Sequence, residues 1–350
     1  MLALTVEPQV PSSVALREVP EPAASEGAIL VQALEVGVCG TDLEIAQGLY
    51  GAAPAGQKRL ILGHESLGRV IQAAPGAGFE PGDLVVGIVR RPDPEPCENC
   101  AVGEWDMCRN GKYTEHGIQQ LDGFCRERFR IAPQSAVRVG QELRGVAVLV
   151  EPMSVLTKAW EHIEAIGARA VFKPQRVLVT GAGPIGLLAA LLGVQRGLEV
   201  HVYDRVVSGP KPELVRDLGA TYHGGLLEAA AAGSDIVIEC TGVPQLVFEA
   251  MRATRRGGIV CLTGVSSGGR ELSVDMAALN RSLVLENDVV FGSVNANRRH
   301  YEAAVNAMTA ADQHWLSRLI TRRVPLSRWR EAFERRGDDV KTVIEFADGR

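Results

Sequence analysis

Two short segments in the first third of the chain carry side chains that bind transition metals. One is Cys39-Gly40-Thr41-Asp42, in a turn after an apolar run, and the other is Gly63-His64-Glu65, just before another such run. A thiolate, an imidazole and a carboxylate suit zinc with one coordination position left open, the arrangement of catalytic zinc sites. Zinc held there would lower the pKa of an alcohol, so that hydride can leave its carbon. The alternative is a core cysteine and an unrelated surface His-Glu pair, and spacing alone does not separate the two.

A second group of cysteines follows in a polar, proline-rich loop. Cys97, Cys100 and Cys108 have the spacing C-x2-C-x7-C, which suits a bound metal better than a hydrophobic core. Three thiols need a fourth ligand to complete the tetrahedron of a structural zinc, and Asp93 or Glu95 would supply it. The alternative is a loop of free thiols without metal.

A glycine-rich turn in the middle of the chain predicts a dinucleotide site. Gly181-Ala182-Gly183-Pro184-Ile185-Gly186 fits G-x-G-x-x-G, between a strand-like run at 176–180 and an apolar stretch of helical length at 185–194. The glycines allow a tight turn, close approach of a pyrophosphate and packing of the helix on the strand. A second strand-like run, 198–203, ends at Asp204, where an acid binds the ribose hydroxyls of an adenosine. A plain βαβ turn is the alternative, but strand, helix and acid together favour dinucleotide binding.

The residues after that second strand, Asp204-Arg205-Val206, favour NAD over NADP. The Asp204 carboxylate would repel a 2′-phosphate and would accept hydrogen bonds from the hydroxyls of NAD. Arg205 acts in the opposite direction, because its guanidinium can neutralise a 2′-phosphate. We expect NAD to be preferred by about tenfold or more, with NADP still accepted.

Composition bounds the class of protein. A chain of 350 residues with 46% hydrophobic residues predicts two domains, and a net charge of −5 gives no reason to expect nucleic acid or an anionic membrane as partner. Residues 1–10 carry no secretory signal, and no apolar run is long enough to span a bilayer, so we expect a cytoplasmic protein. Seven cysteines, an odd number, argue for ligands and core thiols rather than a disulfide framework. Cys125, Cys240 and Cys261 adjoin apolar segments and are expected in the core.

The order of the elements predicts an α/β chain with two kinds of domain. Short apolar runs separated by prolines and glycines predict an irregular β-rich domain first, and alternating strands and helices then predict a doubly wound parallel sheet. The expected strands are 29–36, 66–73, 84–89, 176–180, 198–203, 235–239, 258–262, 289–291 and 341–346, and the expected helices are 151–168, 185–194, 213–218, 244–254 and 300–310.

Taken together, these motifs resemble the zinc-containing alcohol dehydrogenases of the medium-chain dehydrogenase/reductase family, and within them the glucose 1-dehydrogenase branch. The segments 36–42 and 62–65 are shared by many zinc alcohol and polyol dehydrogenases. The pair Arg90-Arg91 and the segments 115–118 and 292–295 look like the sugar-oxidising branch. The resemblance covers nearly the whole chain. It implies a GroES-like catalytic domain in two parts, 1–158 and 297–350, around an NAD(P)-binding Rossmann domain, 159–296.

The resemblance also implies roles for single residues. Thr41 matches a residue that contacts substrate and passes its proton outward, and Asp42 matches an acid that orients a metal-bound histidine. The positions implied for the catalytic zinc are Cys39, His64, Glu65 and Glu151, with Glu151 serving the metal directly, through water, or the sugar instead. Positions implied for the sugar are Thr41, Glu115, Glu151 and Asn295. Those implied for the coenzyme are Gly181, Gly183, Pro184, Ile185, Gly186, Asp204, Arg205, Thr263, Gly264, Val265, Ser293, Val294 and Asn295.

The chain departs from the branch at two places. The structural zinc site of the branch usually has four cysteines, and here the first falls near Pro94. Archaeal relatives that prefer NADP carry Asn or Gly and then two arginines where this chain has Asp204-Arg205-Val206.

The function predicted from these residues is zinc-dependent oxidation of an aldose, D-glucose first, at C1 to the lactone, with hydride transfer to NAD(P). One alternative is the same chemistry on a polyol or a simple alcohol. Another, of a different class, is a metal-free NAD(P)-binding protein without dehydrogenase activity, which the complete set of candidate ligands disfavours. Dimers and tetramers are usual in the family, so we expect a homodimer or a homotetramer.

Overall fold

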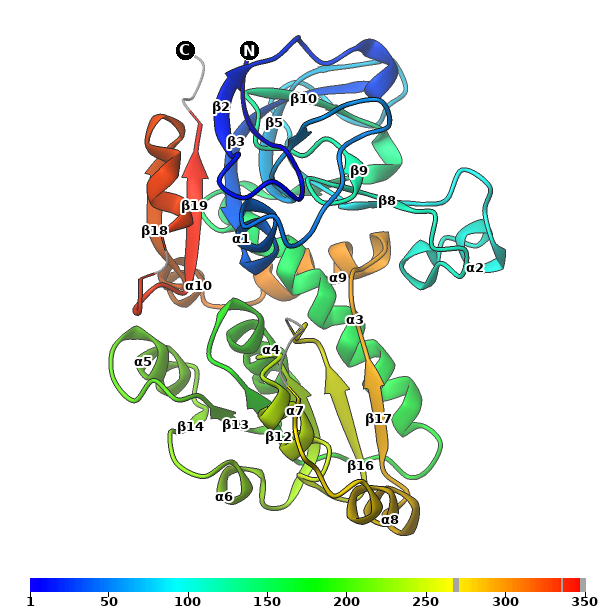
Figure 1. Cartoon of the computed structure of the whole chain (residues 1–350), viewed down its shortest axis with the longest axis vertical. Coiled ribbons are helices and arrows are strands. Elements are labelled where there is room, and N and C mark those ends of the chain that lie inside the picture. Colours follow the sequence, from blue (N-terminus) through cyan, green and yellow to red (C-terminus); the bar gives the residue numbers. More distant parts are fainter. Residues whose placement is uncertain (267–270, 335, 347–350) are drawn as a thin grey trace. The chain divides into compact units, whose positions relative to one another are not determined.

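The computed structural model describes residues 1–266, 271–334 and 336–346, which form two compact units (Figure 1). Unit 1 comprises Met1–Ser154 and Asn295–Arg350, and unit 2 comprises Val155–Val294. Unit 2 is therefore an insertion between two parts of unit 1, and helix α3 (Val150–Gly167) carries the chain from one to the other. None of the described helices has the length and hydropathy that a membrane span requires.

Unit 1 is built on a seven-stranded sheet around the long strand β3. The strand order is β11-β6-β5-β3-β19-β18, and β10 also pairs with β3. Buried apolar side chains of β3 pack against Phe129 and Val70 from the neighbouring strands, which forms the core of the unit. The strands are β3 (Ile29–Val38), β5 (Glu65–Ala73), β6 (Leu84–Gly87), β10 (Arg128–Ile131), β11 (Ala136–Val139), β18 (Ile320–Pro325) and β19 (Lys341–Glu345).

Smaller sheets and short helices complete unit 1. One three-stranded sheet consists of β1 (Leu2–Val6), β2 (Ala15–Glu18) and β4 (Leu60–Ile61), and another of β7 (Arg90–Arg91), β8 (Thr114–His116) and β9 (Gln120–Leu121). The α-helices are α1 (Gly40–Ala46), α2 (Glu98–Ala101), α9 (Arg298–Thr309) and α10 (Gln313–Leu319). The 3₁₀ helices are η1 (Ala24–Glu26), η2 (Trp105–Met107), η3 (Pro133–Ser135), η4 (Gln141–Leu143), η5 (Ala147–Leu149) and η6 (Leu326–Phe333).

Unit 2 is a doubly wound sheet of parallel strands in the order β14-β13-β12-β15-β16-β17. The winding reverses between β12 and β15, and ligands of such sheets bind beyond the carboxyl ends of the strands at that point. Its strands are β12 (Arg176–Thr180), β13 (Glu199–Tyr203), β14 (Thr221–His223), β15 (Ser234–Glu239), β16 (Thr254–Leu262) and β17 (Val289–Gly292). Its helices, besides α3, are α4 (Pro184–Gln195), α5 (Pro210–Asp217), α6 (Leu227–Ala231), α7 (Pro244–Ala250) and α8 (Met276–Glu286).

The fold class expected from the sequence, a β-rich domain with a parallel Rossmann sheet, is confirmed, while several elements begin or end elsewhere than expected. The helix expected over 244–254 ends at Ala250, and the chain is already in β16 at Thr254. The first part of β16 is exposed and pairs with β15 across a register shift between Ser234 and Ile236, so it lacks the apolar pattern of a buried strand. Pairing with β15, and not local sequence, determines that boundary.

The cysteines agree with the expectation of free thiols, with one correction. All seven are unpaired by disulfides, and Cys125 and Cys261 are buried in the core. Cys240 is half-buried instead, because it lies just past the end of β15, where its thiol donates to the Ile238 carbonyl at 3.7 Å.

Candidate active site

Cys39 lies where β3 ends and α1 begins, and the local chain holds its sulfur in place. It is the N-terminal capping residue of α1, with its Sγ accepting from the Thr41 N–H at 3.3 Å. Asp42, in the first turn, accepts from the Cys39 N–H at 2.9 Å. These reciprocal bonds fix the thiol at the N-terminus of α1.

Gly63 is what brings His64 to this thiol. Its φ is +92°, and a Cβ there would lie 2.7 Å from a Val36 methyl and 2.9 Å from the Cys125 Cβ, so a larger residue would not fit. The turn places His64 Nε2 at 3.1 Å from Cys39 Sγ. The other ring nitrogen, Nδ1, faces a carboxylate oxygen of Asp42 at 3.5 Å.

The electrostatics of this pair favour a cation. Burial alone would lower the pKa of His64, but the sulfur of Cys39 and the carboxylate of Asp42 outweigh it and raise that pKa well above its usual value. Burial likewise opposes ionisation of Asp42, and the ring of His64 with the Cys39 N–H nevertheless lowers the pKa of its carboxyl. A buried site that stabilises positive charge in this way is one in which a metal ion is favoured.

Glu65 has a cationic partner that the sequence analysis missed. Lys341 Nζ, on β19, lies 2.6 and 2.7 Å from the two carboxylate oxygens, and both side chains are 2% exposed. Gly37 opposes Glu65 across β3 and β5, where a Cβ would lie 2.0 Å from Oε2. Glycine therefore leaves the space that the ion pair occupies. A lysine at the start of an apolar strand-like segment was the signal for it.

The donor atoms of Cys39, His64 and Glu65 all lie within 4.8 Å of one another, a set whose chemistry fits zinc. Glu151, at the start of α3, belongs to the same surroundings. Desolvation raises the pKa of its carboxyl to about 7, and the acids Glu65 and Glu115 add to this rise against the effect of His64.

Glu115 and Asn295, both expected to contact a sugar, are brought together. Asn295 Nδ2 donates to Glu115 Oε1 at 2.8 Å, and Arg90 donates to the same oxygen at 3.0 Å from Nε and 2.9 Å from Nη2. Arg91 donates to His116 Nε2 at 2.8 Å, so each arginine of β7 holds one residue of β8. The Arg-Arg pair was noticed in the sequence, but its partners were not.

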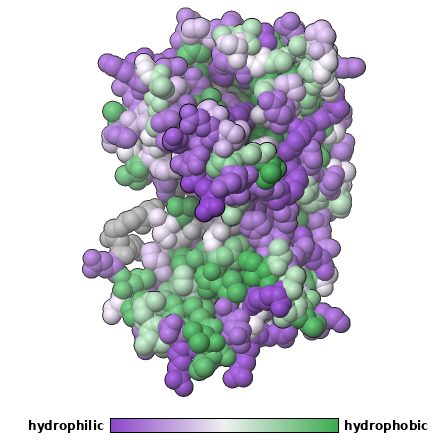
Figure 2. Space-filling model, turned by 90° about the vertical axis from the view of Figure 1, so that its right-hand side faces the viewer, coloured by the Kyte–Doolittle hydropathy of each residue, from purple (hydrophilic) through white to green (hydrophobic). Residues whose placement is uncertain are grey.

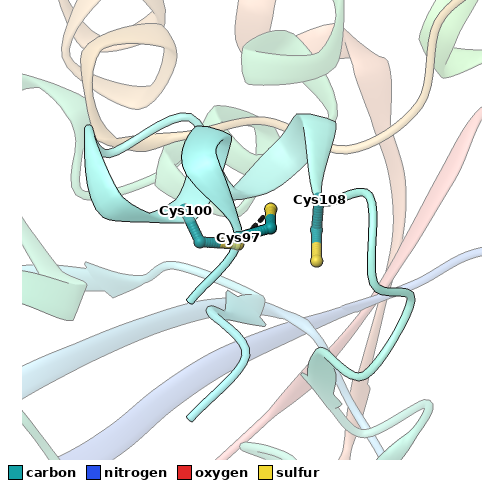
Figure 3. A group of neighbouring side chains, drawn as sticks. All are labelled: Cys97, Cys100 and Cys108. Carbon is teal, nitrogen blue, oxygen red and sulfur yellow. Dashed lines mark hydrogen bonds between the residues drawn. The ribbon is translucent and has the colours of Figure 1, made fainter. Parts of the chain in front are cut away.

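Cys97, Cys100 and Cys108 form a compact cluster of three thiols (Figure 3). The sulfurs of Cys97 and Cys100 are 3.6 Å apart, and the Arg109 N–H donates to Cys97 Sγ at 3.4 Å. This N–H, with that of Cys100, lowers the pKa of Cys97 to about 6, whereas burial raises the pKa of Cys100 to about 11. A thiolate at Cys97 beside a protonated Cys100 is therefore favoured in the cluster.

Neither acid proposed to complete this cluster is among its neighbouring ligand atoms in the described chain. The Asp93 carboxylate instead accepts from the Glu95 N–H at 2.8 Å and from Asn110 Nδ2 at 2.9 Å. The Glu95 side chain is 88% exposed and 4.0 Å from Lys112.

The glycine-rich turn in unit 2 has the geometry of a phosphate-binding loop. Gly181 has φ +91° and donates its N–H to the Tyr203 carbonyl at 2.7 Å. A Cβ on Gly186 would lie 1.7 Å from the Gly181 carbonyl oxygen, whereas one on Gly183 would meet nothing within 4 Å. Gly183 directly precedes α4, followed by Pro184 and Ile185 in its first turn, so the helix N-terminus faces the open side of the turn.

Asp204 is tied to this loop. Its carboxylate accepts from the Ala182 N–H at 2.7 Å and from the Val206 N–H at 3.0 Å, which fixes it beside the glycine turn. Arg205 next to it is exposed. The acid is thus held rigidly, while the arginine projects into solvent.

Glu239, expected from the sequence only as a strand residue, organises the segments around Thr263 and Gly264 that are expected at the coenzyme. Its buried carboxylate accepts from Thr180 Oγ1 at 3.2 Å and from the N–H groups of Thr241 and Gly242 at 2.7 and 3.2 Å. Its backbone carbonyl accepts from the Thr263 hydroxyl at 2.8 Å. The carboxyl ends of β12, β15 and β16 are therefore cross-linked through one residue.

The remaining residues expected at the coenzyme divide between the units. Gly264 packs so tightly that a Cβ would lie 2.2 Å from the Gly242 nitrogen, and Val265 is 76% exposed. Ser293 is buried, and Val294, whose carbonyl accepts from Lys158 Nζ at 3.0 Å, is 58% exposed. Asn295 belongs to unit 1, with Glu115.

Family models match nearly the whole chain. Residues 25–141 match the alcohol dehydrogenase GroES-like domain, and residues 144–346 match the glucose dehydrogenase C-terminus. The two matches correspond to the resemblance read from the motifs.

Individual relatives agree along their full length. The chain is 42% identical to a glucose 1-dehydrogenase of Thermoproteus tenax and 38% identical to one of Methanocella arvoryzae, in both cases over 99% of each chain. Among solved structures, a Haloferax mediterranei glucose dehydrogenase in complex with NADP, zinc and gluconolactone has a TM-score of 0.92 and 32% identity, over 100% of each chain. These findings and the motifs agree: the chain belongs to the zinc-containing medium-chain dehydrogenase family, in its glucose dehydrogenase branch.

Proposed function

We propose that this chain is a glucose 1-dehydrogenase-like enzyme, which oxidises D-glucose or a related aldose at C1 to the lactone with hydride transfer to NAD(P). The observation that carries the proposal is the pair of the half-buried Cys39 and the buried His64, 3.1 Å apart. It lies in the same unit as an anchored carboxylate and amide, Glu115 and Asn295. The names and bound ligands of the relatives described above support the same substrate and coenzyme.

A zinc ion would be held by Cys39 and His64, with Glu65 or Glu151 as an acidic ligand, directly or through water. When bound, zinc supplies a Lewis acid that lowers the pKa of the substrate hydroxyl. Asp42 orients the ring of His64 so that Nε2 and not Nδ1 faces the Cys39 sulfur. Because Lys341 already neutralises Glu65, Glu151 is the acid with more freedom to serve the metal.

The protein groups that handle the substrate are those expected from the branch. The Thr41 hydroxyl contacts the reacting hydroxyl and passes its proton outward. Glu115, Glu151 and Asn295 bind the remaining sugar hydroxyls, since several fixed polar groups are needed to recognise a particular arrangement of hydroxyls.

The coenzyme binds in a Rossmann domain, 159–296, and the catalytic domain comprises 1–158 and 297–350. The turn from Gly181 to Gly186 would hold the pyrophosphate, and Asp204 would accept from the adenosine ribose. Because this carboxylate is fixed beside the turn, it repels a 2′-phosphate, and the enzyme prefers NAD while still using NADP.

A second, structural zinc would be held by Cys97, Cys100 and Cys108, with an oxygen atom as fourth ligand. Asp93 would supply that oxygen once its carboxylate gives up the 2.9 Å bond from Asn110.

The enzyme is cytoplasmic and a homodimer or homotetramer. The edge strand β17 of the Rossmann sheet and the neighbouring helix α8 form the contact surface, because Val284 and Leu285 on α8 are 65% and 62% exposed. Apolar side chains also gather over part of the face shown in Figure 2, and exposed apolar patches are typical of association surfaces.

The experiment is a screen of sugars and polyols with NAD and NADP on metal-analysed protein. Glucose should give the highest kcat/KM, with NAD about tenfold better than NADP. Cys39→Ser and His64→Ala should abolish turnover but keep coenzyme binding, because the glycine turn lies in another unit. Asp204→Asn should shift the coenzyme ratio toward NADP.

Other results would favour other functions. A preference for polyols or simple alcohols would favour the second activity within the family. Coenzyme binding without turnover of any substrate, in protein without zinc, would indicate a binding protein. Full activity without metal would overturn the zinc-dependent mechanism itself.

A further inference from the structure

The carboxylate of Glu115 is held by an unusually complete set of donors. Arg90 and Asn295 contribute three hydrogen bonds of 2.8 to 3.0 Å, and all three reach Oε1 rather than Oε2. The side chains of Arg90 and Glu115 are 5% and 8% exposed, so the pair is shielded from water. A fork-like guanidinium on one oxygen fixes the orientation of a carboxylate and leaves the other oxygen for a ligand hydroxyl.

Arg90 is itself fixed by the segment that carries the cysteine cluster. We call residues 97–108 the cysteine lobe; in Figure 1 its helix α2 projects from the rest of unit 1. Arg90 Nη1 donates to the Asp106 carbonyl, in η2 of the lobe, at 3.1 Å. The guanidinium also stacks on the ring of Tyr113, with 3.7 Å between its carbon and the ring centroid.

The second holder of Glu115 is anchored at the same place. Asn297, two residues after Asn295, donates from Nδ2 to Asp106 Oδ1 at 3.0 Å and to Glu104 Oε2 at 2.9 Å. Asn297 is 2% exposed, so these contacts are inside the protein. One short segment, residues 104–106, therefore holds both Arg90 and the chain just after Asn295, the two residues that donate to Glu115.

That segment is in turn coupled to the thiols. Asn99, between Cys97 and Cys100, donates from Nδ2 to the Met107 carbonyl at 2.6 Å, and Cys108 directly follows η2. A shift of the three sulfurs relative to one another would therefore also move the segment that contacts Arg90 and Asn297.

We propose that residues 104–106 of the cysteine lobe position the Glu115 carboxylate through Arg90 and Asn297, so that the lobe sets the affinity for the sugar. The inference rests on the proposed role of Glu115 in binding sugar. Asp106 is a positioning residue, because its contacts reach Arg90 and Asn297 and it acts on substrate through them. If the lobe were merely structural, substitutions in it would lower stability and would change the sugar KM no more than kcat and the coenzyme KM.

The test is a double-mutant cycle on the full-length, zinc-loaded enzyme. Asp106→Ala removes one of the two carboxylates that accept from Asn297, and Arg90→Lys keeps the charge but loses the fork on Glu115. Each should raise the KM for glucose by about tenfold, with kcat and the KM for the coenzyme within about twofold. In a Glu115→Gln background neither substitution should raise the glucose KM further, because the group on which both act has been altered.

Two further variants keep the result interpretable. Asp106→Asn retains an oxygen that accepts from Asn297 and should restore the wild-type KM even if Asp106→Ala is less stable. Glu98→Ala removes an exposed acid from the same lobe without touching this network and should leave all kinetic constants unchanged. Zinc content and the unfolding temperature are measured for every variant.

The outcomes separate the inference from the proposed function. The positioning role is wrong, and the sugar-binding role of Glu115 stands, in two cases. In the first, Glu115→Gln raises the glucose KM but Asp106→Ala and Arg90→Lys do not. In the second, all three raise it, and the double variants show the full product of the two single effects. If Glu115→Gln itself leaves the glucose KM unchanged, the proposed role of Glu115 is wrong, and the inference falls with it. A fall in kcat together with equal rises in the KM for glucose and the KM for the coenzyme would indicate a merely structural lobe.

Discussion

At the scale of single residues, the pairing of Glu65 with Lys341 changes what each can contribute. A carboxylate in contact with an ammonium group at 2.6 Å is a weaker metal ligand than a free one, since its charge is already matched. The two opposite charges of the pair cancel, so the pair adds no net charge beside Cys39 and His64. Burial would lower the pKa of Lys341, but Glu65 and Cys39 outweigh this and raise it, so the ammonium stays charged.

Removal of the lysine should therefore be costly. Lys341→Met leaves the Glu65 carboxylate buried without a partner, and we expect a loss of about 3–5 kcal/mol in the free energy of unfolding. Adding Glu65→Gln should recover much of that loss, because the uncompensated charge is then gone. Denaturant unfolding of the two variants measures both effects, and a single variant as stable as wild type would contradict the ion pair.

His116 predicts a pH dependence of stability. Burial, and then the charge of Arg91, lowers its pKa well below the usual value, so the folded protein holds the ring neutral. The unfolded chain takes up a proton below about pH 6.5, so the stability that the neutral ring allows is complete above that pH and is lost as the pH falls. The contribution of His116 to the slope is expected to be roughly 1.4 kcal/mol for each pH unit between about 6.5 and 5.

His116→Asn should flatten this slope, because an amide can still donate to the Asp122 carbonyl that the ring contacts at 2.6 Å but cannot be protonated. The matched control is His314→Asn, at an exposed position, which should leave the slope as it is. Urea unfolding across this range measures the slopes, and identical slopes for His116→Asn and wild type would refute the assignment.

At the scale of the elements, the turn between β12 and α4 contains one glycine with no space for a side chain, Gly186, and one with open space around it, Gly183. Gly186→Ala would push a Cβ into the Gly181 carbonyl, so we expect unit 2 to be destabilised by about 3 kcal/mol or more. Gly183→Ala has open space around it and should fold normally, yet weaken the coenzyme by about tenfold or more, since the new methyl group faces the pyrophosphate. Thermal unfolding and coenzyme titration separate the two, and tight coenzyme binding by Gly183→Ala would place the pyrophosphate elsewhere.

The elements also indicate how far sequence alone reaches. The glycine turn, the strands flanking it and the Cys39 and His64 motifs could be predicted, because each depends on residues close together in the chain. Lys341 and Glu65 are 276 positions apart, and the bonds from Asn297 to residues 104 and 106 are nearly as long-range. Such partners follow from the register of β19 on β3 and from the path of the lobe, which no local pattern encodes. The short helix α6, five residues long, was missed because helices of that length depend on packing.

At the scale of the whole molecule, the exposed apolar residues of α8 predict an association surface. Val284→Glu with Leu285→Lys should shift the protein toward monomers, because charged side chains at a buried contact are costly to desolvate. Light scattering after size-exclusion chromatography measures the mass. The matched control is Val171→Glu, a change at an 89% exposed apolar residue outside α8 and β17. A variant with the mass of wild type would place the contact on another surface.

The position of Lys341 has a consequence for how the protein is made. A ribosome completes β3 and β5 early, then synthesises all of unit 2, and only afterwards reaches β19. Domains fold largely as they emerge, so the coenzyme-binding unit can be complete while Glu65 still lacks its lysine. During that interval the nascent chain has the thiol and imidazole of the proposed metal site but an uncompensated carboxylate beside them. Metal acquired at that stage would meet a more acidic set of ligands than the finished protein offers, and the arrival of β19 would then withdraw Glu65 from it.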